Sequence, residues 1–240
     1  VDQFLHLAGS KKFIDTFLVV IQFGSILAVL ILYFNKLNPF SSRKSPKAKK
    51  ATWDLWIKVL IAVLPSGIIG VLFEDQIDRI FFRPSVVAAA LIIYGIIMIW
   101  IENRHRKPGI TKFSQVSYKT ALLIGLFQCL ALVPGTSRSG STIIGATLLG
   151  TSRFIAAEFS FFLAIPTMLG ASLLKLLKAG FAFTGFEWFI MFVGSLVAFI
   201  VSVIVIKFFM SYIKKHDFKA FGAYRIVLGI IVFIYFAIAG

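Results

Sequence analysis

Long apolar stretches separated by short polar connections dominate the chain from residue 13 onward. Six of them are long enough to cross the hydrocarbon core of a bilayer as α-helices, which takes about 20 residues each. These predicted spans cover residues 13–34, 55–73, 85–101, 154–177, 188–209 and 221–239. The pattern predicts an all-α polytopic membrane protein, with residues 1–240 forming a single integral membrane domain.

Two shorter apolar pieces lie between the third and fourth spans. They cover residues 116–133 and 139–150, and the second is too short to cross a bilayer. A polar run separates them, and non-helical backbone at membrane depth is tolerated only where it is buried in protein or lines a cavity. We therefore predict a re-entrant helix pair over residues 116–150, which enters and leaves the membrane on the same side.

Composition and charge agree with a membrane protein. Hydrophobic residues make up 59% of the chain and charged residues 15%, which does not suit a water-soluble domain of this size. The formal net charge of +15 would also suit nucleic-acid binding, but the Lys and Arg residues gather in alternate connections. Their distribution follows the positive-inside rule, so residues 35–54 are predicted to form a cytoplasmic loop and no nucleic-acid partner is expected.

The polar run between the two shorter pieces surrounds one arginine, Arg138, with small hydroxylated residues. An arginine at membrane depth costs roughly 2.5 kcal/mol or more on insertion scales, so it usually marks a functional site. Pro134 and Gly135 should end the incoming helix and let the backbone turn. The amides that start the next helix would then form an anion site, to which Arg138 adds a fork suited to phosphate. The neighbouring hydroxyl donors are Thr136, Ser137, Ser139, Ser141 and Thr142.

Two other interpretations of this run have less support in its residues. The spacing of Gly135, Gly140 and Thr142 is close to that of the nucleotide-binding phosphate loop, but Ser141 stands where that loop has lysine. No parallel-sheet pattern surrounds it, so the nucleotide site is rejected. In a purely structural interpretation, the hydroxyls form hydrogen bonds with the free backbone groups of a broken helix, and Arg138 pairs with a carboxylate. Five hydroxyls and an arginine are more polar groups than a helix kink requires. A phosphate or diphosphate site is therefore favoured.

Three segments together resemble a known family. Residues 128–142, QCLALVPGTSRSGST, residues 159–166, FSFFLAIP, and residues 20–28, VIQFGSILA, are similar to the undecaprenyl-diphosphate phosphatases of the bacitracin-resistance type. The resemblance implies a multi-pass enzyme of the bacterial cell membrane that removes one phosphate from the C55 prenyl diphosphate. That reaction recycles the lipid carrier of peptidoglycan synthesis, so the expected partners are the prenyl diphosphate substrate and membrane lipids.

The resemblance also assigns residues to the site. Arg138 would clamp the diphosphate, and Ser137 and Thr142 are the other catalytic positions in this motif. The expected substrate-binding residues are Gly135, Thr136, Ser139, Gly140, Ser141 and Gln128.

One part of the family pattern is missing from the sequence. The family's other motif, two glutamates followed by a Ser-Ser-Thr-Gly-His stretch, would end just before Val1. The family draws from it acid/base carboxylates, a histidine and ligands for a divalent metal. The resemblance therefore implies a Mg²⁺ or Ca²⁺ ion with no ligand among the residues present, and we expect an N-terminally truncated fragment that is inactive alone.

Several expectations complete the prediction. Family members are built from inverted repeats, and residues 17–28 and 159–170 show a faint internal similarity. A transporter or flippase of prenyl phosphates that uses the same pocket is the alternative function, and a homo-oligomer is left open. Arg225 is interpreted as a residue at the end of a span, and Gly194, Ala198 and Ser202 as a close-packing helix face.

Overall fold

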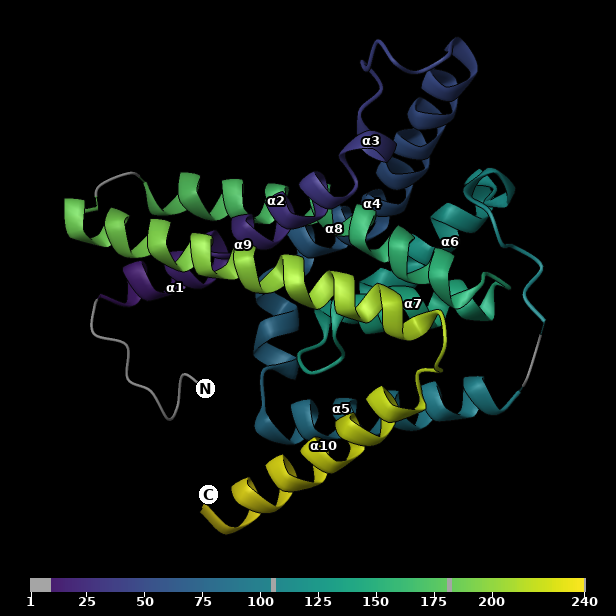
Figure 1. Ribbon diagram of the computed structural model, residues 1–240. Coiled ribbons are helices and arrows are strands. Elements are labelled where there is room, and N and C mark those ends of the chain that lie inside the picture. Colours follow the sequence, from purple (N-terminus) through teal and green to yellow (C-terminus); the bar gives the residue numbers. More distant parts are fainter. Residues whose placement is uncertain (1–9, 105–106, 181–182, 240) are drawn as a thin grey trace. The chain divides into compact units, whose positions relative to one another are not determined.

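The computed structural model describes residues 10–104, 107–180 and 183–239. Within those residues it contains ten α-helices and two short 3₁₀ helices, and no named β-strand (Figure 1). The α-helices are α1 (Lys11–Val20), α2 (Gln22–Leu32), α3 (Phe34–Leu37), α4 (Pro46–Phe81), α5 (Pro84–Asn103), α6 (Tyr118–Cys129), α7 (Arg138–Leu148), α8 (Arg153–Ala179), α9 (Gly185–Ile213) and α10 (Lys219–Ala239). The 3₁₀ helices are η1 (Phe113–Gln115) and η2 (Leu130–Leu132).

The six predicted spans are confirmed as helices with the length and composition to cross a membrane. They are Lys12–Leu32, Pro46–Phe73, Pro84–Asn103, Arg153–Lys178, Gly185–Ile213 and Lys219–Ile238. The segment Tyr118–Leu132 is a shorter apolar helix, and α7 has only 11 residues. Neither is long enough to cross a bilayer alone, and the re-entrant arrangement of the pair stays a prediction.

The predicted loop over residues 35–54 is wrong in its second half, because α4 already begins at Pro46. Ser45 accepts a hydrogen bond from the Ala48 amide at 3.3 Å, and proline occupies the first helical position. Serine followed by proline is a common start of a helix, since the serine caps an amide and proline lacks one. The helix also continues past the apolar stretch as far as Phe81.

The chain divides into two compact units, of which the first comprises residues 1–38 and 164–209. In this unit Gly24 of α2 touches the backbone of α9, because an added Cβ would lie 2.0 Å from the Ser195 carbonyl oxygen. Ser25 and Ser202 share a hydrogen bond of 2.8 Å, and a Cβ on Gly194 would meet Phe17 at 2.9 Å. The predicted packing face of α9 is therefore confirmed at Gly194 and Ser202.

The second unit comprises residues 39–163 and 210–240 and contains the predicted phosphate site. Helices α5 and α10 lie side by side (Figure 1), and a Cβ on Gly95 would stand 2.6 Å from the Gly222 carbonyl oxygen. Helix α6 lies equally close to α4, where a Cβ on Gly125 would be 2.2 Å from the Ala62 carbonyl oxygen. These close contacts fix α5, α6 and α10 around the turn that leads into α7.

Candidate active site

The turn between η2 and α7 has an unusual backbone. Gly135 has a φ of 90°, and a Cβ there would lie 2.6 Å from the Val87 carbonyl oxygen of α5. Ser137 has a φ of 66° and is the one non-glycine residue with positive φ in the part of the chain that the structure describes. Such backbone costs of order 1–3 kcal/mol and is concentrated at functional sites. The strain therefore supports the prediction that this turn is functional.

Ser137 also caps the N-terminus of α7. Its hydroxyl accepts a hydrogen bond from the Gly140 amide at 3.3 Å and lies 3.3 Å from the Ser139 hydroxyl. Both serines are exposed, and Arg138 between them is the first residue of the helix. The first amides of a helix have no carbonyl partner within it and carry a partial positive charge. This end of α7 can therefore bind an anion.

Arg138 is partly buried, and no described residue accepts a hydrogen bond from its guanidinium or forms an ion pair with it. The structural interpretation of the sequence, in which a carboxylate pairs with Arg138, has no support in the described residues. A partly buried guanidinium without a protein partner is well suited to an anionic ligand. Folding has already removed part of its water, so binding an anion requires less further desolvation.

The other hydroxyls of the motif bond within the protein. Thr136 donates to the carbonyl oxygens of Leu130 at 3.0 Å and Val133 at 2.8 Å. Ser141 donates to the Ser137 carbonyl oxygen at 3.1 Å. All three buried hydroxyl residues of the run, Thr136, Ser141 and Thr142, are at most 3% exposed. Ser137 and Ser139 are thus the accessible hydroxyls, and the catalytic and substrate-binding assignments remain predictions.

Thr142 is joined to the start of α8. Its hydroxyl and that of Ser160 share a hydrogen bond of 2.7 Å between two buried groups. It also lies 3.1 Å from the carbonyl oxygens of Arg138 and Ser139 in its own helix. These contacts hold the first turn of α7 in place and give Thr142 a structural contribution that the sequence did not indicate.

Arg225 is the residue that sequence reasoning missed. It lies about two turns into α10 rather than at the end of a span, so the earlier interpretation is wrong. Its Nη2 atom donates to the carbonyl oxygens of Gly135 at 2.8 Å and Thr136 at 3.0 Å. Its Nη1 atom would be 4.0 Å from a Cβ on Gly140. A charged residue inside an apolar helix is a functional indication that could have singled it out.

Gln128 connects α6 to α4. Its Nε2 atom donates to the Ser66 hydroxyl, which in turn donates to the Val63 carbonyl oxygen at 3.2 Å. The side chain is 2% exposed, and its Oε1 atom has no partner among the described residues. A buried amide oxygen without a donor is unusual and costly. Among the described residues no hydrogen bond joins Gln128 to the turn, so its predicted role in substrate binding stays a prediction.

The site does not fit the divalent metal that the resemblance implies. Among the described residues, no group of three or more His, Cys, Asp or Glu side chains could hold a metal ion. The groups around the turn are hydroxyls, amides and two guanidinium groups, none of which is a typical ligand for Mg²⁺ or Ca²⁺ in this arrangement. The metal stays a prediction, and no chemical step is derived through it.

Comparison with known proteins identifies the family of this chain. A family model described as bacitracin resistance protein BacA matches residues 1–231. The chain belongs to the BacA family. It is 73% identical to undecaprenyl-diphosphatase 1 of Clostridioides difficile, over 98% of this chain and 86% of that protein. It is 56% identical to the undecaprenyl-diphosphatase of Acetivibrio thermocellus, over 98% of this chain and 88% of that protein. The undecaprenyl-diphosphatase of Enterococcus faecalis is also 56% identical, over 99% of this chain and 88% of its own length.

The comparisons confirm the family resemblance that the sequence motifs indicated. BacA membership and the six apolar helices together make this a multi-pass bacterial membrane protein. The family match includes the whole turn from Gln128 to Thr142, because these residues lie within the matched range.

Proposed function

We propose that this chain is an undecaprenyl-diphosphatase, which hydrolyses undecaprenyl diphosphate to undecaprenyl phosphate and inorganic phosphate. The observation that carries the proposal is the 73% identity, along 98% of the chain, to a protein of that name. Recycling the lipid carrier of peptidoglycan synthesis in this way would also account for bacitracin resistance, from which the family takes its name. The prenyl tail of the substrate would lie in the membrane among the apolar helices.

The turn supplies the groups that bind the diphosphate. Arg138 would hold the terminal phosphoryl group in a bidentate contact, with the first amides of α7 and the exposed hydroxyls of Ser137 and Ser139 as further donors. In the overall hydrolysis, the oxygen atom of a water molecule becomes bonded to the terminal phosphorus, and the protons of that water end on the two phosphate products or in the solvent. The bond from that phosphorus to the bridging oxygen breaks, and the oxygen leaves with the electron pair on undecaprenyl phosphate. Fixed donors around the transferred group stabilise the charge that develops during this displacement.

Arg225 contributes by positioning the turn. Because its Nη2 atom binds the carbonyl oxygens of Gly135 and Thr136, it fixes the peptide groups that precede the α7 N-terminus. Arg138 then projects from a backbone whose conformation is held from α5 through Val87 and from α10 through Arg225. Preorganised donors of this kind need no rearrangement when the substrate reacts.

Three further expectations belong to this proposal. A Mg²⁺ or Ca²⁺ ion and the acid/base carboxylates come from the family resemblance, and both stay predictions. A homo-oligomer likewise stays a prediction.

The test is release of inorganic phosphate from undecaprenyl diphosphate in detergent micelles, with Mg²⁺ or Ca²⁺ present. The chain is assayed beside a version extended upstream to include the expected glutamate and histidine motif. Arg138→Lys should lower kcat/KM by about 100-fold or more in the active form, because lysine keeps the charge but loses the fork. Arg79→Lys, at an exposed position on α4, is the control and should leave the rate unchanged.

Two results would contradict parts of the proposal. Near-normal turnover by Arg138→Lys would remove Arg138 from the site and leave the hydrolase assignment standing. Movement of prenyl diphosphate across vesicle membranes without release of phosphate, by both versions of the chain, would instead support the transporter.

A further inference from the structure

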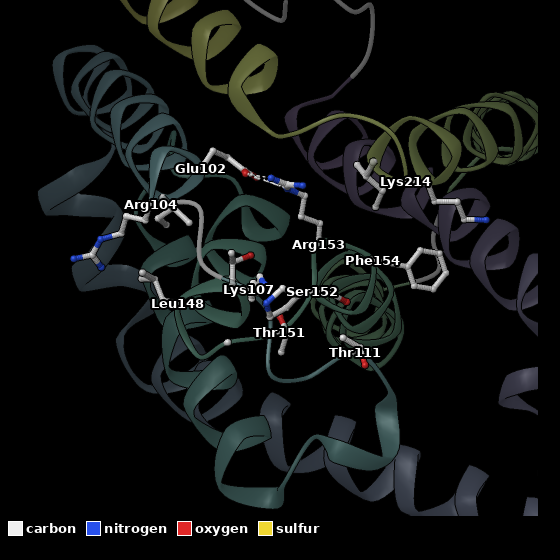
Figure 2. A pocket seen from close by; sticks show the side chains of 15 residues that line it. Glu102, Arg104, Lys107, Thr111, Leu148, Thr151, Ser152, Arg153, Phe154 and Lys214 are labelled. Carbon is white, nitrogen blue, oxygen red and sulfur yellow. Dashed lines mark hydrogen bonds and ion pairs between the residues drawn. The ribbon is translucent and has the colours of Figure 1, made fainter.

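A cavity of about 760 Å³ lies in the second unit, away from the turn that holds Arg138. Its walls come from the end of α5, the segment that follows it, the junction of α7 with α8, and the end of α9 (Figure 2). The volume falls in the range of about 300–1,000 Å³ that is typical of small-molecule sites. The cavity is therefore large enough for a ligand bigger than water or a simple ion.

Four cations and one carboxylate line this cavity. Arg104, Lys107, Arg153 and Lys214 surround it, and the carboxylate is that of Glu102. Figure 2 shows the Arg153 guanidinium pointing toward Glu102, and its Nε donates to Oε1 at 2.8 Å. Glu102 is buried and also accepts the Phe218 amide at 3.2 Å, so its charge is neutralised within the protein. The cavity keeps a formal surplus of three positive charges.

Aromatic rings hold two of these cations at the rim. The Arg104 guanidinium lies 4.0 Å from the Trp100 ring centroid, and the Lys214 ammonium lies 5.5 Å from that of Phe154. Such contacts attract a charged group to the face of its ring. Neither contact neutralises the positive charge, so both cations remain able to attract an anion.

One residue of the cavity lining has a buried, unpaired hydroxyl. Thr151 is 3% exposed, and its Oγ1 atom is buried without a hydrogen-bond partner among the described residues. Thr151 lines the cavity together with Ser152, whose hydroxyl accepts the Ile155 amide at 3.3 Å and so caps α8. Leaving a buried hydroxyl unpaired is unfavourable. A ligand oxygen that displaced the atoms covering Oγ1 would supply the missing partner, and it would also meet the positive N-terminus of the long helix α8.

We propose that this cavity is a second phosphate-binding site, which holds the phosphate group of an anionic lipid headgroup. A phosphate suits the surplus of positive charge, the helix N-terminus and the Thr151 hydroxyl at once. The cavity exceeds the size of the free ion, and apolar walls at Ile101, Leu148 and Ile213 suit an attached glycerol or acyl portion. Basic pockets between membrane helices on the cytoplasmic side bind such headgroups in other proteins.

The cavity and the turn are separate sites at opposite ends of α7. Arg138 begins that helix, whereas Thr147 and Leu148 at its other end line the cavity, which places the two about 15 Å apart along the helix axis. Arg104 and Lys107 come from one basic connection and Lys214 from another, and both connections are predicted to be cytoplasmic. The cavity would bind its phosphate whether or not the turn hydrolyses prenyl diphosphate.

The test measures lipid binding to the full chain in detergent by native mass spectrometry, with phosphatidylglycerol or phosphatidylcholine added. A second arm measures binding of inorganic phosphate alone by equilibrium dialysis. Lys214→Gln should weaken phosphatidylglycerol binding about fivefold, which corresponds to the loss of one basic residue near an anionic lipid. Thr151→Val keeps the shape of the side chain but removes the hydroxyl, and it should weaken binding by a similar factor.

Lys215→Gln is the matched control, because Lys215 is the exposed neighbour of Lys214 and does not line the cavity. Binding of phosphatidylglycerol that falls in Lys214→Gln and not in Lys215→Gln supports the lipid site. Binding of inorganic phosphate with the same pattern, and no preference for phosphatidylglycerol, supports a phosphate site whose ligand is the free ion. Equal loss in the two lysine variants, or no loss in Lys214→Gln, overturns the proposal. Lys214 is exposed, so this comparison stands even where Thr151→Val fails to fold.

Discussion

Helix α7 lies between two glycines, Gly135 and Gly150, that share a φ of 90°. At Gly135 an added Cβ would meet the backbone of Val87, whereas at Gly150 it would meet no described atom within 4 Å. The threonine that follows each glycine shows the same difference. The Thr136 hydroxyl donates to two carbonyl oxygens, whereas the Thr151 hydroxyl has no hydrogen-bond partner among the described residues. The backbone at the Gly135 end is therefore tightly packed, whereas the Gly150 end has open space beside the cavity and a buried hydroxyl without a described partner.

The arginines at the two ends show the opposite pattern. Arg153, beside the open cavity, is bound to Glu102, while Arg138, beside the tightly packed turn, has no partner among the described residues. A guanidinium with a carboxylate partner contributes to the fold, and one without is left for a ligand. A packed backbone that carries an unpaired arginine is the arrangement expected of a preorganised anion site.

The largest expected effect separates the two glycines. Gly135→Ala should lower the free energy of unfolding by roughly 3 kcal/mol or more, because it adds a steric clash to an unfavourable φ. Gly150→Ala meets only the unfavourable φ and should cost about 1 kcal/mol. Thermal unfolding of both variants in detergent micelles measures the difference. Equal losses of unfolding free energy would mean that the backbone at Val87 can move aside, and that the turn is not tightly packed against α5.

The second prediction separates Arg225 from Arg138. Arg225→Lys should lower the free energy of unfolding by about 2 kcal/mol, because lysine lacks the partly buried Nη2 group that donates to two carbonyl oxygens. Arg138→Lys should change it by no more than about 0.5 kcal/mol, since no described protein group depends on the Arg138 guanidinium. Denaturant unfolding in the same detergent compares them. A larger loss of stability in Arg138→Lys would show that Arg138 supports the fold.

Much of the fold followed from the sequence, because apolar length and the positions of polar breaks are local properties. The six membrane helices are predictable for that reason, as is the turn at Pro134 and Gly135. Arg225 was missed because a charge six residues from a connection resembles the boundary of a span. The hydrogen bond between Thr142 and Ser160 joins two helices, so no local pattern in the motif reveals it. The cavity is assembled from four separate segments, so it could not be predicted from any one of them.

The third prediction concerns Thr142, which the family resemblance places in the catalytic set. Thr142→Val should lower the free energy of unfolding by about 1.5 kcal/mol, because it leaves the buried Ser160 hydroxyl without its partner. Replacing both residues, Thr142→Val with Ser160→Ala, should cost less than the sum of the single variants. A double-mutant cycle from unfolding curves gives this coupling. Additive losses would show that the two hydroxyls do not support each other.

The smallest effect on the free energy of unfolding is expected at Ser137. Its backbone strain destabilises the fold, whereas its cap on α7 stabilises it. Ser137→Ala loses the hydrogen bond to the Gly140 amide while keeping the unfavourable φ of 66°, so it should cost about 1 kcal/mol. Ser137→Gly loses the same bond but relieves the strain, and it should stay within about 0.5 kcal/mol of the unchanged protein. Phosphate release by the same two variants then isolates the hydroxyl. If Ser137 only shapes the turn, Ser137→Gly should retain activity that Ser137→Ala loses. Equal loss in both, despite the restored stability of the glycine variant, would show that the hydroxyl itself acts on the substrate.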